Sequence, residues 1–511
     1  MCRPDESELR SSQPIVGWGS LKLGAMASTT ALALRPAEGW RSLTLGWWIA
    51  AIAPLAAAAV AFVLILDAQL LRLFSVSAPS WDLGFHQQLL WSLANGHGWS
   101  SSFEYGHNFI GIHLEPILLP IAAIELVWPS PVVPLVFAAA GLAATAPAAF
   151  LMFRAMLPDR PAARWLALAI ATPMPFWAAM QQAGAEQFHP EHLALPFGML
   201  AVWAGLRARP WLLWTLAILV ISCKEDQTYT AFVIGLVIWR VGPEAMRPHG
   251  RRIMILAVAW LVILGGLLEE LVRGGTGYSP DVAYYWWVFN PADSNFFLRN
   301  VTRPDAWLVL SGLLVSLAGL PLLAPRWLLL VLPPLFANLM SSHDAQGRLA
   351  LHYAMVVMFP LIVAAGFGAR RLLAMDVKRF RLPAAALLAA AVPALVIGLL
   401  FGEVPPAFGA DQWLYTRTPA VDRLLAATRV IPPDAPVYAD NGAAVWLANR
   451  QSIQVLGSDL PPDRYIVVDR QDWAHRLQAS AARADIIAKL EASGRRLLVD
   501  DGRFQVWSPP G

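Results

Sequence analysis

The chain has 511 residues, of which 57% are hydrophobic and only 14% are charged. Its mean hydropathy of +0.51 is too high for a water-soluble globular chain, so we expect a polytopic membrane protein. The formal charge of +3 is nearly balanced and argues against a nucleic-acid partner. The two cysteines, Cys2 and Cys223, lie too far apart in the likely topology for a disulfide framework, and the sequence has no CxxC or Cys/His finger spacing.

The chain begins with a polar segment, residues 1–42, that contains Ser and Arg but no early apolar stretch with a cleavage site. We interpret it as a disordered cytosolic tail and not as a signal peptide. Met26 is an alternative start of the protein.

A helix that crosses a membrane needs roughly 20 apolar residues, and this length predicts about eleven spans within residues 43–401. The clear candidates are residues 43–66, 131–153, 163–181, 252–272, 306–323, 352–368 and 383–401. The shorter candidates are residues 193–206, 211–223, 227–240 and 327–341.

The arginines orient these spans, because loops rich in Arg and Lys stay in the cytosol. All the arginine groups between the spans fall on one side if the N-terminus is cytosolic. The other side then holds an outer loop, residues 67–130, and the C-terminal segment. Within that loop, residues 116–128 are short and carry Glu125, so we expect a helix at the outer interface and not a crossing.

The C-terminal segment, residues 402–511, has a different pattern. Apolar and polar residues alternate around Asp-Asn-Gly and Asp-Gly turns, with the helical stretch AARADIIAKLEASG between them. The pattern predicts a small α/β domain, which the topology places outside the cytosol.

Polar residues that carry chemistry collect in the predicted outer loops. Eight of the ten histidines lie there: His86, His97, His107, His113, His189, His192, His343 and His352. The segment from Asp82 to Asn95 has the pattern of an amphipathic helix on the membrane surface. Asp82 either caps the start of this helix or has a functional role, and the pattern is compatible with both.

The stretch FHPEHLALP, residues 188–196, opens an apolar helix with three polar residues. Its structural interpretation is a helix start, with Pro190 in the first turn and Glu191 at the positive end. Alternatively, His189 and His192, three residues apart, bind a divalent metal ion with Glu191, or donate hydrogen bonds to a phosphate.

Two further segments are polar between apolar stretches. Lys224, Glu225 and Asp226 form either a simple turn or a recessed site, and the short flanking spans favour the site. The segment 341–355 offers Arg348 and His352, as part of a polar loop or of an anion-binding group.

The order of these motifs resembles the DUF2079 family of predicted bacterial membrane proteins. The resemblance rests on WDLGFHQQLLWSLANG at 81–96, HLEP at 113–116, FHPEHLALPF at 188–197, KED at 224–226 and HY with a downstream FP at 352–360. It covers most of residues 75–460, including NGAAVWLANRQSIQVLG. The architecture of the family is similar to that of the GT-C class of membrane glycosyltransferases.

This resemblance implies an enzyme of the bacterial inner membrane that takes a sugar from a polyprenyl-phosphate donor. Asp82 occupies the place of the acidic residue that follows the first span, although it is not part of a DD or DE pair as in many GT-C enzymes. Asp82 and Glu191 are then the candidate catalytic residues, with Asp82 as general base. The candidate substrate-binding residues are His86, His113, Glu115, His189, His192, Lys224, Glu225, Asp226, Arg348 and His352.

Other functions remain open at this point. A transporter or lipid-handling protein for an anionic substrate would also place charges beside short spans. An envelope protein that responds to metal or pH would use the same histidines. We expect Asp82, His113, Glu191, His192, Lys224 and Glu225 to converge on one outer site in the transferase.

Overall fold

The computed structural model describes residues 45–104, 106–273, 284–289, 295–375, 389–457, 459–471 and 480–511. The expected tail, residues 1–42, and the first part of the expected span 383–401 lie outside these ranges. The chain divides into two compact units, residues 1–47 and 48–511, and all the described residues except 45–47 belong to the second.

Most of the described chain is helical, and short 3-10 or π turns carry the label η. The N-terminal half contains α1 (Leu45–Phe74), η2 (Ser80–Gly84), α2 (Phe85–Ala94), η3 (Ser102–Glu104), η4 (Phe109–Gly111), α3 (Leu118–Glu125), α4 (Val132–Met156), α5 (Pro161–Ala171), η5 (Met174–Phe176), α6 (Ala178–Glu186), α7 (Glu191–Leu206), α8 (Pro210–Ile221), η6 (Glu225–Gln227), α9 (Thr228–Val241), η7 (Glu244–Met246), α10 (Arg247–Ala259), η8 (Trp260–Leu268) and α11 (Glu269–Arg273).

The second half continues with helices before it reaches the strands. These helices are η9 (Trp286–Phe289), α13 (Asn295–Thr302), α14 (Pro304–Ser316), η11 (Leu320–Leu323), α15 (Pro325–Leu328), η12 (Leu329–Val331), α16 (Leu332–Met340), α17 (Asp344–Gly347), η13 (Leu351–Ala354), α18 (Met355–Ala374), η14 (Ala389–Ala391), α20 (Val392–Phe401), α21 (Gln412–Tyr415), α22 (Val421–Thr428), α23 (Asn441–Trp446) and α24 (Ser480–Ala492).

Four described helical stretches are long and apolar enough to cross a membrane: Ala51–Phe74, Val132–Met156, Glu244–Arg273 and Asp344–Ala374. Five shorter apolar helices of 10–17 residues lie where further spans were expected: Glu191–Leu206, Pro210–Ile221, Pro304–Ser316, Pro325–Met340 and Val392–Phe401. The count of eleven spans therefore stays a prediction.

One expected span is broken in a way that the sequence explains. Residues 163–181 were expected to form one helix, but α5 ends at Ala171 and α6 begins at Ala178. Pro173 and Pro175 lie between them, and proline cannot donate the backbone hydrogen bond that a continuous helix needs. After the break, α6 ends at Glu186, close to His189 and His352 of the predicted outer loops.

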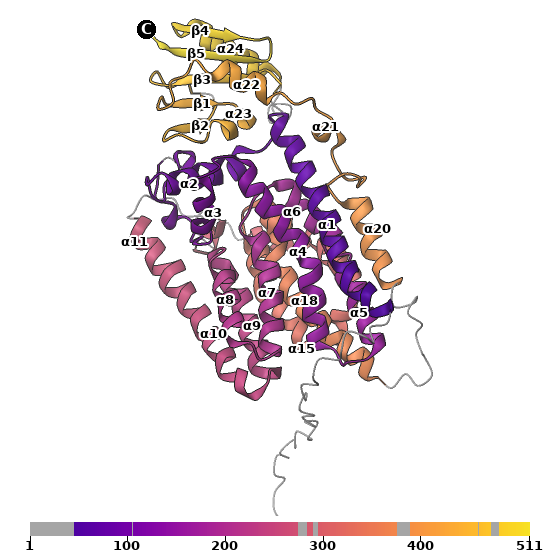
Figure 1. Ribbon diagram of the computed structural model, residues 1–511. Helices are drawn as coiled ribbons and strands as arrows, with labels where there is room; N and C mark the ends of the chain where they lie inside the picture. Colours follow the sequence, from indigo (N-terminus) through magenta and orange to yellow (C-terminus); the bar gives the residue numbers. More distant parts are fainter. Residues whose placement is uncertain are drawn as a thin grey trace, which may run out of the picture. The chain divides into compact units, whose positions relative to one another are not determined.

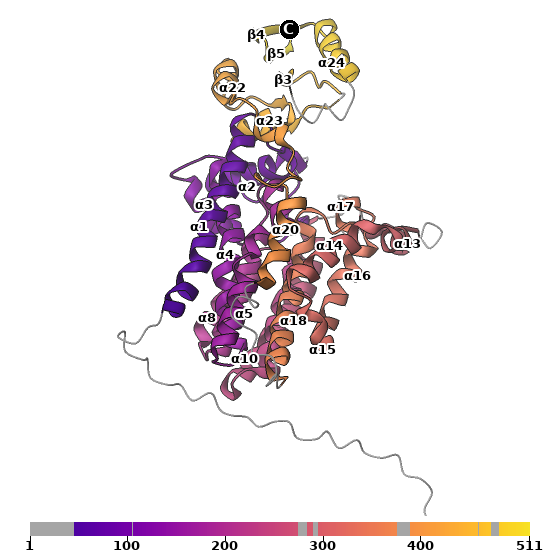
Figure 2. The same cartoon turned by 90° about the vertical axis from the view of Figure 1, so that its right-hand side faces the viewer.

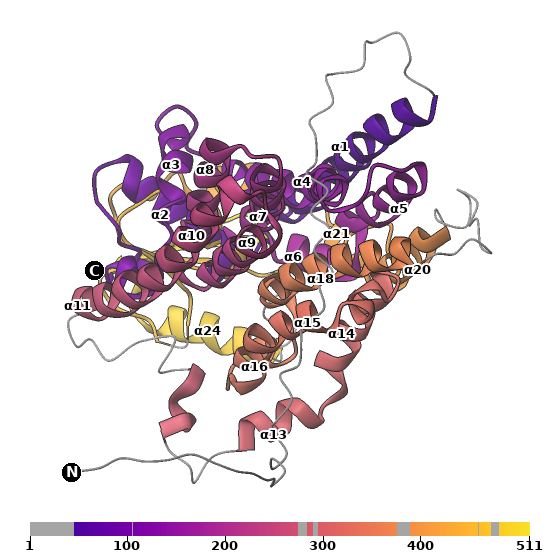
Figure 3. The same ribbon diagram turned by 90° about the horizontal axis from the view of Figure 1, so that it is seen from below.

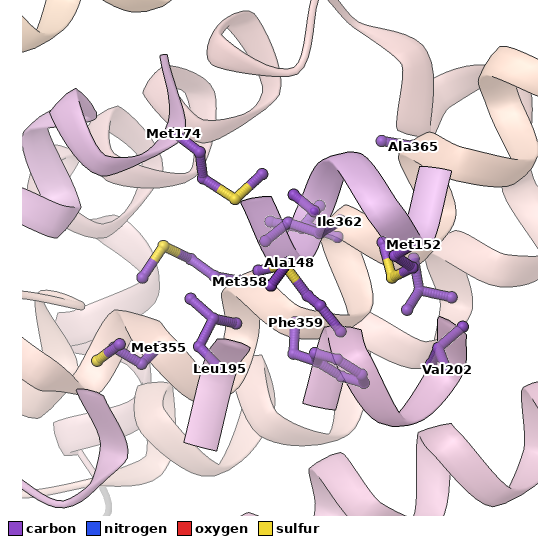
Figure 4. Close-up of a cluster of buried hydrophobic side chains, with 14 of the residues drawn as sticks. Ala148, Met152, Met174, Leu195, Val202, Met355, Met358, Phe359, Ile362 and Ala365 are labelled. Atoms are coloured by element: carbon purple, nitrogen blue, oxygen red, sulfur yellow. The ribbon is translucent and has the colours of Figure 1, made fainter. Parts of the chain in front are cut away.

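The helical core lies where α4, α7 and α18 pack side by side (Figure 1). Met152 of α4, Leu195 of α7 and Phe359 of α18 point into one buried cluster (Figure 4). Viewed along the helices, α8, α9 and α10 gather on one side of this core and α14, α15 and α16 on the other (Figure 3). This packing fixes the ends of α6, α7 and α18, which carry the polar residues.

The C-terminal segment forms a five-stranded sheet in the order β2-β1-β3-β5-β4, with strands β1 (Val437–Ala439), β2 (Ile453–Val455), β3 (Tyr465–Asp469), β4 (Arg495–Asp500) and β5 (Phe504–Pro510). The first three strands are parallel, and β4 and β5 join as an antiparallel pair. Alternate residues face opposite sides. Ile466 and Val468 pack with α24, whereas Val467 packs with α22 and α23, so the helices cover both faces (Figure 2).

Candidate functional site

Asp82 lies just beyond the first long helix, inside the short turn η2 that leads into α2. The interpretation of Asp82 as the N-cap is wrong, because Pro79 holds that position. The backbone carbonyl of Asp82 instead accepts a hydrogen bond from Nδ1 of His86, at 2.8 Å. The Asp82 side chain is 27% exposed and faces His189, with 3.4 Å between Oδ1 and Nε2.

Behind Asp82 lies a buried group made of Glu186, His189 and His352. Oε2 of Glu186 lies 2.8 Å from Nδ1 of His352, and Oε1 lies 3.4 Å from Nε2 of His189. The two imidazole rings are stacked, with centroids 3.8 Å apart. Burial lowers the pKa of His189, but the carboxylates of Glu186 and Asp82 raise it by a larger amount, so the net shift is upward. We call Asp82, Glu186, His189 and His352 the acid-histidine cluster.

Glu191 and Lys224 form a second buried pair next to this cluster. Nζ of Lys224 lies 2.9 Å from Oε1 of Glu191, and the same oxygen lies 3.9 Å from Nε2 of His352. Burial lowers the pKa of Lys224, but the nearby carboxylates, Glu191 first among them, hold it well above its usual value. Lys224 therefore stays charged, and Glu191 connects it to the acid-histidine cluster.

His113 and Glu225 form a third pair at a more exposed position. Nδ1 of His113 lies 2.8 Å from Oε1 of Glu225, and the backbone N–H of Leu114 donates to the other carboxylate oxygen at 3.1 Å. Burial raises the pKa of Glu225, but His113 lowers it more, and in return Glu225 raises the pKa of His113. The neighbouring Asp226 is exposed.

His86 connects this region to Glu115 in the predicted outer loop. Its Nε2 lies 3.3 Å from Oε2 of Glu115, while Nδ1 faces the Asp82 carbonyl. Both side chains are buried. The imidazole therefore fixes the turn of Asp82 against the segment that precedes α3.

Two of the expected site residues are not part of the acid-histidine cluster. The ring of His192 is fully buried beside that of His189, with centroids 6.0 Å apart, but among the described residues neither of its nitrogens has a hydrogen-bond partner. Arg348 is half exposed and forms ion pairs with Asp344 at 2.9 Å and Asp305 at 3.5 Å. The structure thus gathers His189 with Glu186 and His352, and not with Glu191 and His192 as the spacing suggested.

The backbone around the acid-histidine cluster is strained. Gln187 has a φ of 91°, and Leu349 and Leu351 have φ values of 57° and 59°. Side chains with a Cβ atom rarely adopt this left-handed region, and each such residue costs about 1–3 kcal/mol. These residues directly precede the segments that carry His189 and His352, and strain of this kind is found most often at functional sites.

Sequence reasoning missed two residues that lie here. Glu186 stands three residues before His189 in the stretch EQFHPEH, and this i, i+3 spacing of a carboxylate and a histidine was the available signal. Arg72, in the last turn of α1, is buried and donates a hydrogen bond to the carbonyl of Ala185. No local pattern distinguishes Arg72 from a cytosolic or interfacial arginine, since its role depends on the packing of α1 against α6.

Hydrogen bonds from the C-terminal segment hold the turn η2, which carries Asp82. Oδ1 of Asn441, at the start of α23, accepts a hydrogen bond from the backbone N–H of Ser80 at 2.8 Å and another from its hydroxyl. Nε2 of Gln87 in α2 donates to Oδ1 of Asn449 at 2.8 Å, and Nη2 of Arg503 donates to the carbonyl of Ser75 at 3.0 Å. Residues of the sheet region therefore fix η2 and α2.

A family model for predicted membrane proteins, DUF2079, matches residues 72–485, which include every residue of the acid-histidine cluster. The chain belongs to this family. No curated protein matches its sequence. Membership in DUF2079 confirms the resemblance drawn from the ordered motifs and identifies the chain as a predicted membrane protein.

Solved structures similar to this DUF2079 protein include an ArnT and an oligosaccharyltransferase. ArnT from Cupriavidus metallidurans bound to undecaprenyl phosphate gives a TM-score of 0.51 at 11% identity, over 92% of this chain and 100% of that chain. The oligosaccharyltransferase of Archaeoglobus fulgidus in the apo form gives a TM-score of 0.45 at 12% identity, over 92% of this chain and 75% of that chain. The similarity to ArnT confirms the expected GT-C-like fold, and at this identity it shows the fold alone.

Proposed function

We propose that this protein transfers a sugar from a polyprenyl-phosphate donor to an acceptor on the outer face of the membrane, with inversion at the sugar carbon. In this proposal the chain crosses the bacterial inner membrane about eleven times, with a cytosolic N-terminus and the sheet outside. The fold shared with ArnT, whose solved structure contains undecaprenyl phosphate, supports a lipid-linked donor.

One observation carries the assignment of the general base. Asp82 is 27% exposed, whereas Glu186 and Glu191 are 6% and 2% exposed. Of these three carboxylates, Asp82 is therefore the one that a substrate reaches without a rearrangement of the helices. A base must come within about 2.6–3.2 Å of the proton donor, and this requirement favours Asp82.

The reaction is a single displacement. The oxygen of the acceptor hydroxyl bonds to the anomeric carbon of the sugar while the bond from that carbon to the phosphate oxygen breaks. Asp82 takes the hydroxyl proton, and the polyprenyl phosphate leaves with the electron pair of the broken bond. Positive charge develops on the sugar and negative charge on the phosphate, so a fixed cation near the phosphate lowers the barrier.

Lys224 is our candidate for that cation. Its ammonium group is mostly buried and is held by Glu191, so its position is fixed before the donor binds. Arg348, which we expected to share this role, is engaged with Asp305 and Asp344 and is not part of the proposal. Glu191 keeps Lys224 in place and is a positioning residue in this scheme.

The test is sugar transfer by the purified full-length chain in lipid, with labelled polyprenyl-phosphate sugars as donors. We expect turnover by the wild type and by Asp434→Asn, a matched change at an exposed carboxylate of the C-terminal segment. Asp82→Asn should lose at least about 100-fold in rate, because general-base catalysis contributes about 10²–10⁴-fold.

Other results would point to other functions. Binding of the labelled lipid without turnover in any of the three proteins would overturn the transferase and support a transporter or lipid-handling protein. Turnover that survives Asp82→Asn would keep the transferase but overturn Asp82 as its base.

A further inference from the structure

We propose that Glu186, His189 and His352 bind one divalent first-row transition-metal ion. One ligand atom from each of these residues lies within 4.8 Å of the other two. They come from the end of α6, from the loop before α7 and from the turn before α18, so the fold and not a local motif assembles them. Binding of the ion does not depend on the proposed sugar transfer.

The distances fit a coordination sphere. Nε2 of His189 lies 3.4 Å from Oε1 of Glu186 and 3.4 Å from Oδ1 of Asp82. A tetrahedral ion with bonds of about 2.0–2.1 Å separates its ligands by about 3.3 Å. The separation between His189 and Glu186 matches this edge and is longer than a well-formed hydrogen bond. Nδ1 of His352 and Oε2 of Glu186, at 2.8 Å, form a hydrogen bond that an ion would replace as the two atoms move apart.

One buried nitrogen of this group also makes no hydrogen bond, as expected of an atom that binds an ion. Nε2 of His189 is buried and has no hydrogen-bond partner among the described residues, although it points at two carboxylates. A buried polar atom without a partner is costly, and an ion that the chain binds explains its retention. The strained φ angles at Gln187 and Leu351, just before His189 and His352, show that the fold holds both rings at an energetic cost.

The surroundings support one particular ligand atom of His352. Its Nδ1 donates a hydrogen bond to Oε2 of Glu186 at 2.8 Å, and on metal binding this nitrogen gives up its proton and shares the ion with that carboxylate. Its other nitrogen, Nε2, lies 3.9 Å from Oε1 of Glu191. A histidine that binds a metal usually directs its second nitrogen at a carboxylate, and Glu191, held by Lys224, is the carboxylate on that side, although at 3.9 Å it accepts no hydrogen bond from Nε2.

The ligand set selects the kind of ion. Two imidazoles and one carboxylate suit Zn²⁺, Co²⁺ or Mn²⁺, whereas Mg²⁺ and Ca²⁺ prefer oxygen ligands only. Three protein ligands leave a further position, which lies on the side of the partly exposed Asp82. A role of the ion in holding a donor phosphate at that position rests on the proposed function.

The experiment measures binding directly in the full-length protein, in detergent, after treatment with a chelator. Titration calorimetry with Zn²⁺, and absorption spectra with Co²⁺, should show one ion per chain in the wild type. Glu186→Gln and His352→Gln should each abolish this binding. Glu191→Gln should weaken it by about 10–100-fold, as for a residue that orients a ligand.

His343→Gln is the matched control, since His343 stacks on Tyr284 and is not part of the ligand group. It should bind Zn²⁺ like the wild type. Gel filtration and melting curves identify a variant that does not fold, and in that case the other ligand variant decides the question. Failure of the folded wild type to bind Zn²⁺ and Co²⁺, or binding that persists in a folded ligand variant, would overturn the site.

The same samples separate this proposal from the transferase. Zn²⁺ binding without sugar transfer would leave the metal site intact and remove the proposed function. Sugar transfer by chelated wild type that binds no Zn²⁺ would do the reverse.

Discussion

His352 donates two hydrogen bonds to one oxygen of Glu186, from its backbone N–H at 2.9 Å and from ring Nδ1 at 2.8 Å, although the residues are 166 positions apart. The pair joins the end of α6 to the turn η13 that leads into α18. Because both groups are buried, the two helices hold each other in one relative position at the cluster. The arrangement around it leads to four predictions.

Glu225→Gln should destabilise the protein through the loss of its ion pair with His113. The pair is partly exposed, so we expect a loss of about 1 kcal/mol in the free energy of unfolding. The raised pKa of His113 means that this contribution is present below about pH 6.5 and is lost as the pH rises through the shifted value. Melting curves should therefore show a larger difference between the wild type and Glu225→Gln at pH 6 than at pH 9 (about three units apart).

Asp434→Asn is its control, because Asp434 is an exposed carboxylate of the C-terminal segment. It should alter the free energy of unfolding by less than about 0.5 kcal/mol. Equal losses at both pH values in Glu225→Gln would contradict the assigned role of the His113 charge.

Glu125→Gln should make the protein less sensitive to alkaline pH. Burial at the end of α3 raises the pKa of Glu125 from 4.5 to about 7, despite a hydrogen bond from Gln87. The folded protein thus holds a proton that the unfolded chain releases, so stability falls as the pH rises from about 4.5 to about 7. The loss, at most about 3 kcal/mol, should be absent in the variant.

The measurement is the melting temperature of both proteins at pH 5 and pH 8.5 (on the two sides of the window). We expect the wild type to lose more between these values than Glu125→Gln. A parallel decline in the two proteins would show that Glu125 ionises freely in the folded state.

Gly141→Ala should disturb the start of α7 and with it Glu191. A Cβ atom at Gly141 would lie 2.5 Å from the backbone oxygen of His192, and a backbone atom cannot move away at low cost. We expect a loss of about 1–3 kcal/mol in stability, as for other overpacked cores, and reduced transfer activity.

Gly312→Ala is the matched control in another helix. Its added Cβ would meet only Ile397, at an ordinary 3.9 Å, and Ala is the better helix former by about 0.5–1 kcal/mol. It should melt no lower than the wild type. If the two variants had the same melting temperature, the close packing of α4 on α7 would not explain the glycine at position 141.

Asn441→Ala should slow the reaction without a large change in donor binding. Oδ1 of Asn441 accepts from the backbone N–H of Ser80, two residues before Asp82, so its loss frees the turn that carries the proposed base. We expect a reduction of about tenfold in kcat, with KM for the donor nearly unchanged.

Gln454→Ala, on strand β2 of the same sheet, serves as its control, because Gln454 has no contact with η2 among the hydrogen bonds of the described residues. It should retain wild-type kcat. A change confined to KM in Asn441→Ala would show that the sheet acts on the substrate and not through Asp82.

Several features of this protein followed from local sequence alone. The long apolar stretches predicted α1, α4 and the other long helices, because hydrophobic length and periodicity act within one segment. The amphipathic stretch from Asp82 predicted the helix that the structure shows as η2 and α2. Alternation and turn residues predicted a C-terminal segment with strands, which the sheet confirms.

The membership of the site depended on the tertiary structure. HPEH suggested that His189 binds a ligand together with His192, but neither nitrogen of His192 has a hydrogen-bond partner among the described residues, whereas His189 faces Glu186. Arg348 looked equally suited to an anion site, yet it pairs with Asp344, one turn before it in the chain. Residue spacing determines which side chains share a face of one helix, whereas contacts between helices depend on how their apolar faces pack.

The sequence by itself therefore determined the class of protein, its main helices and the short polar segments where chemistry is concentrated. Only the packing of α6 against the turn η13 before α18 decided that Glu186 and His352 meet, because their apposition requires two helix ends far apart in the chain to come together at one depth. The periodicity of any single segment contains no information about that depth.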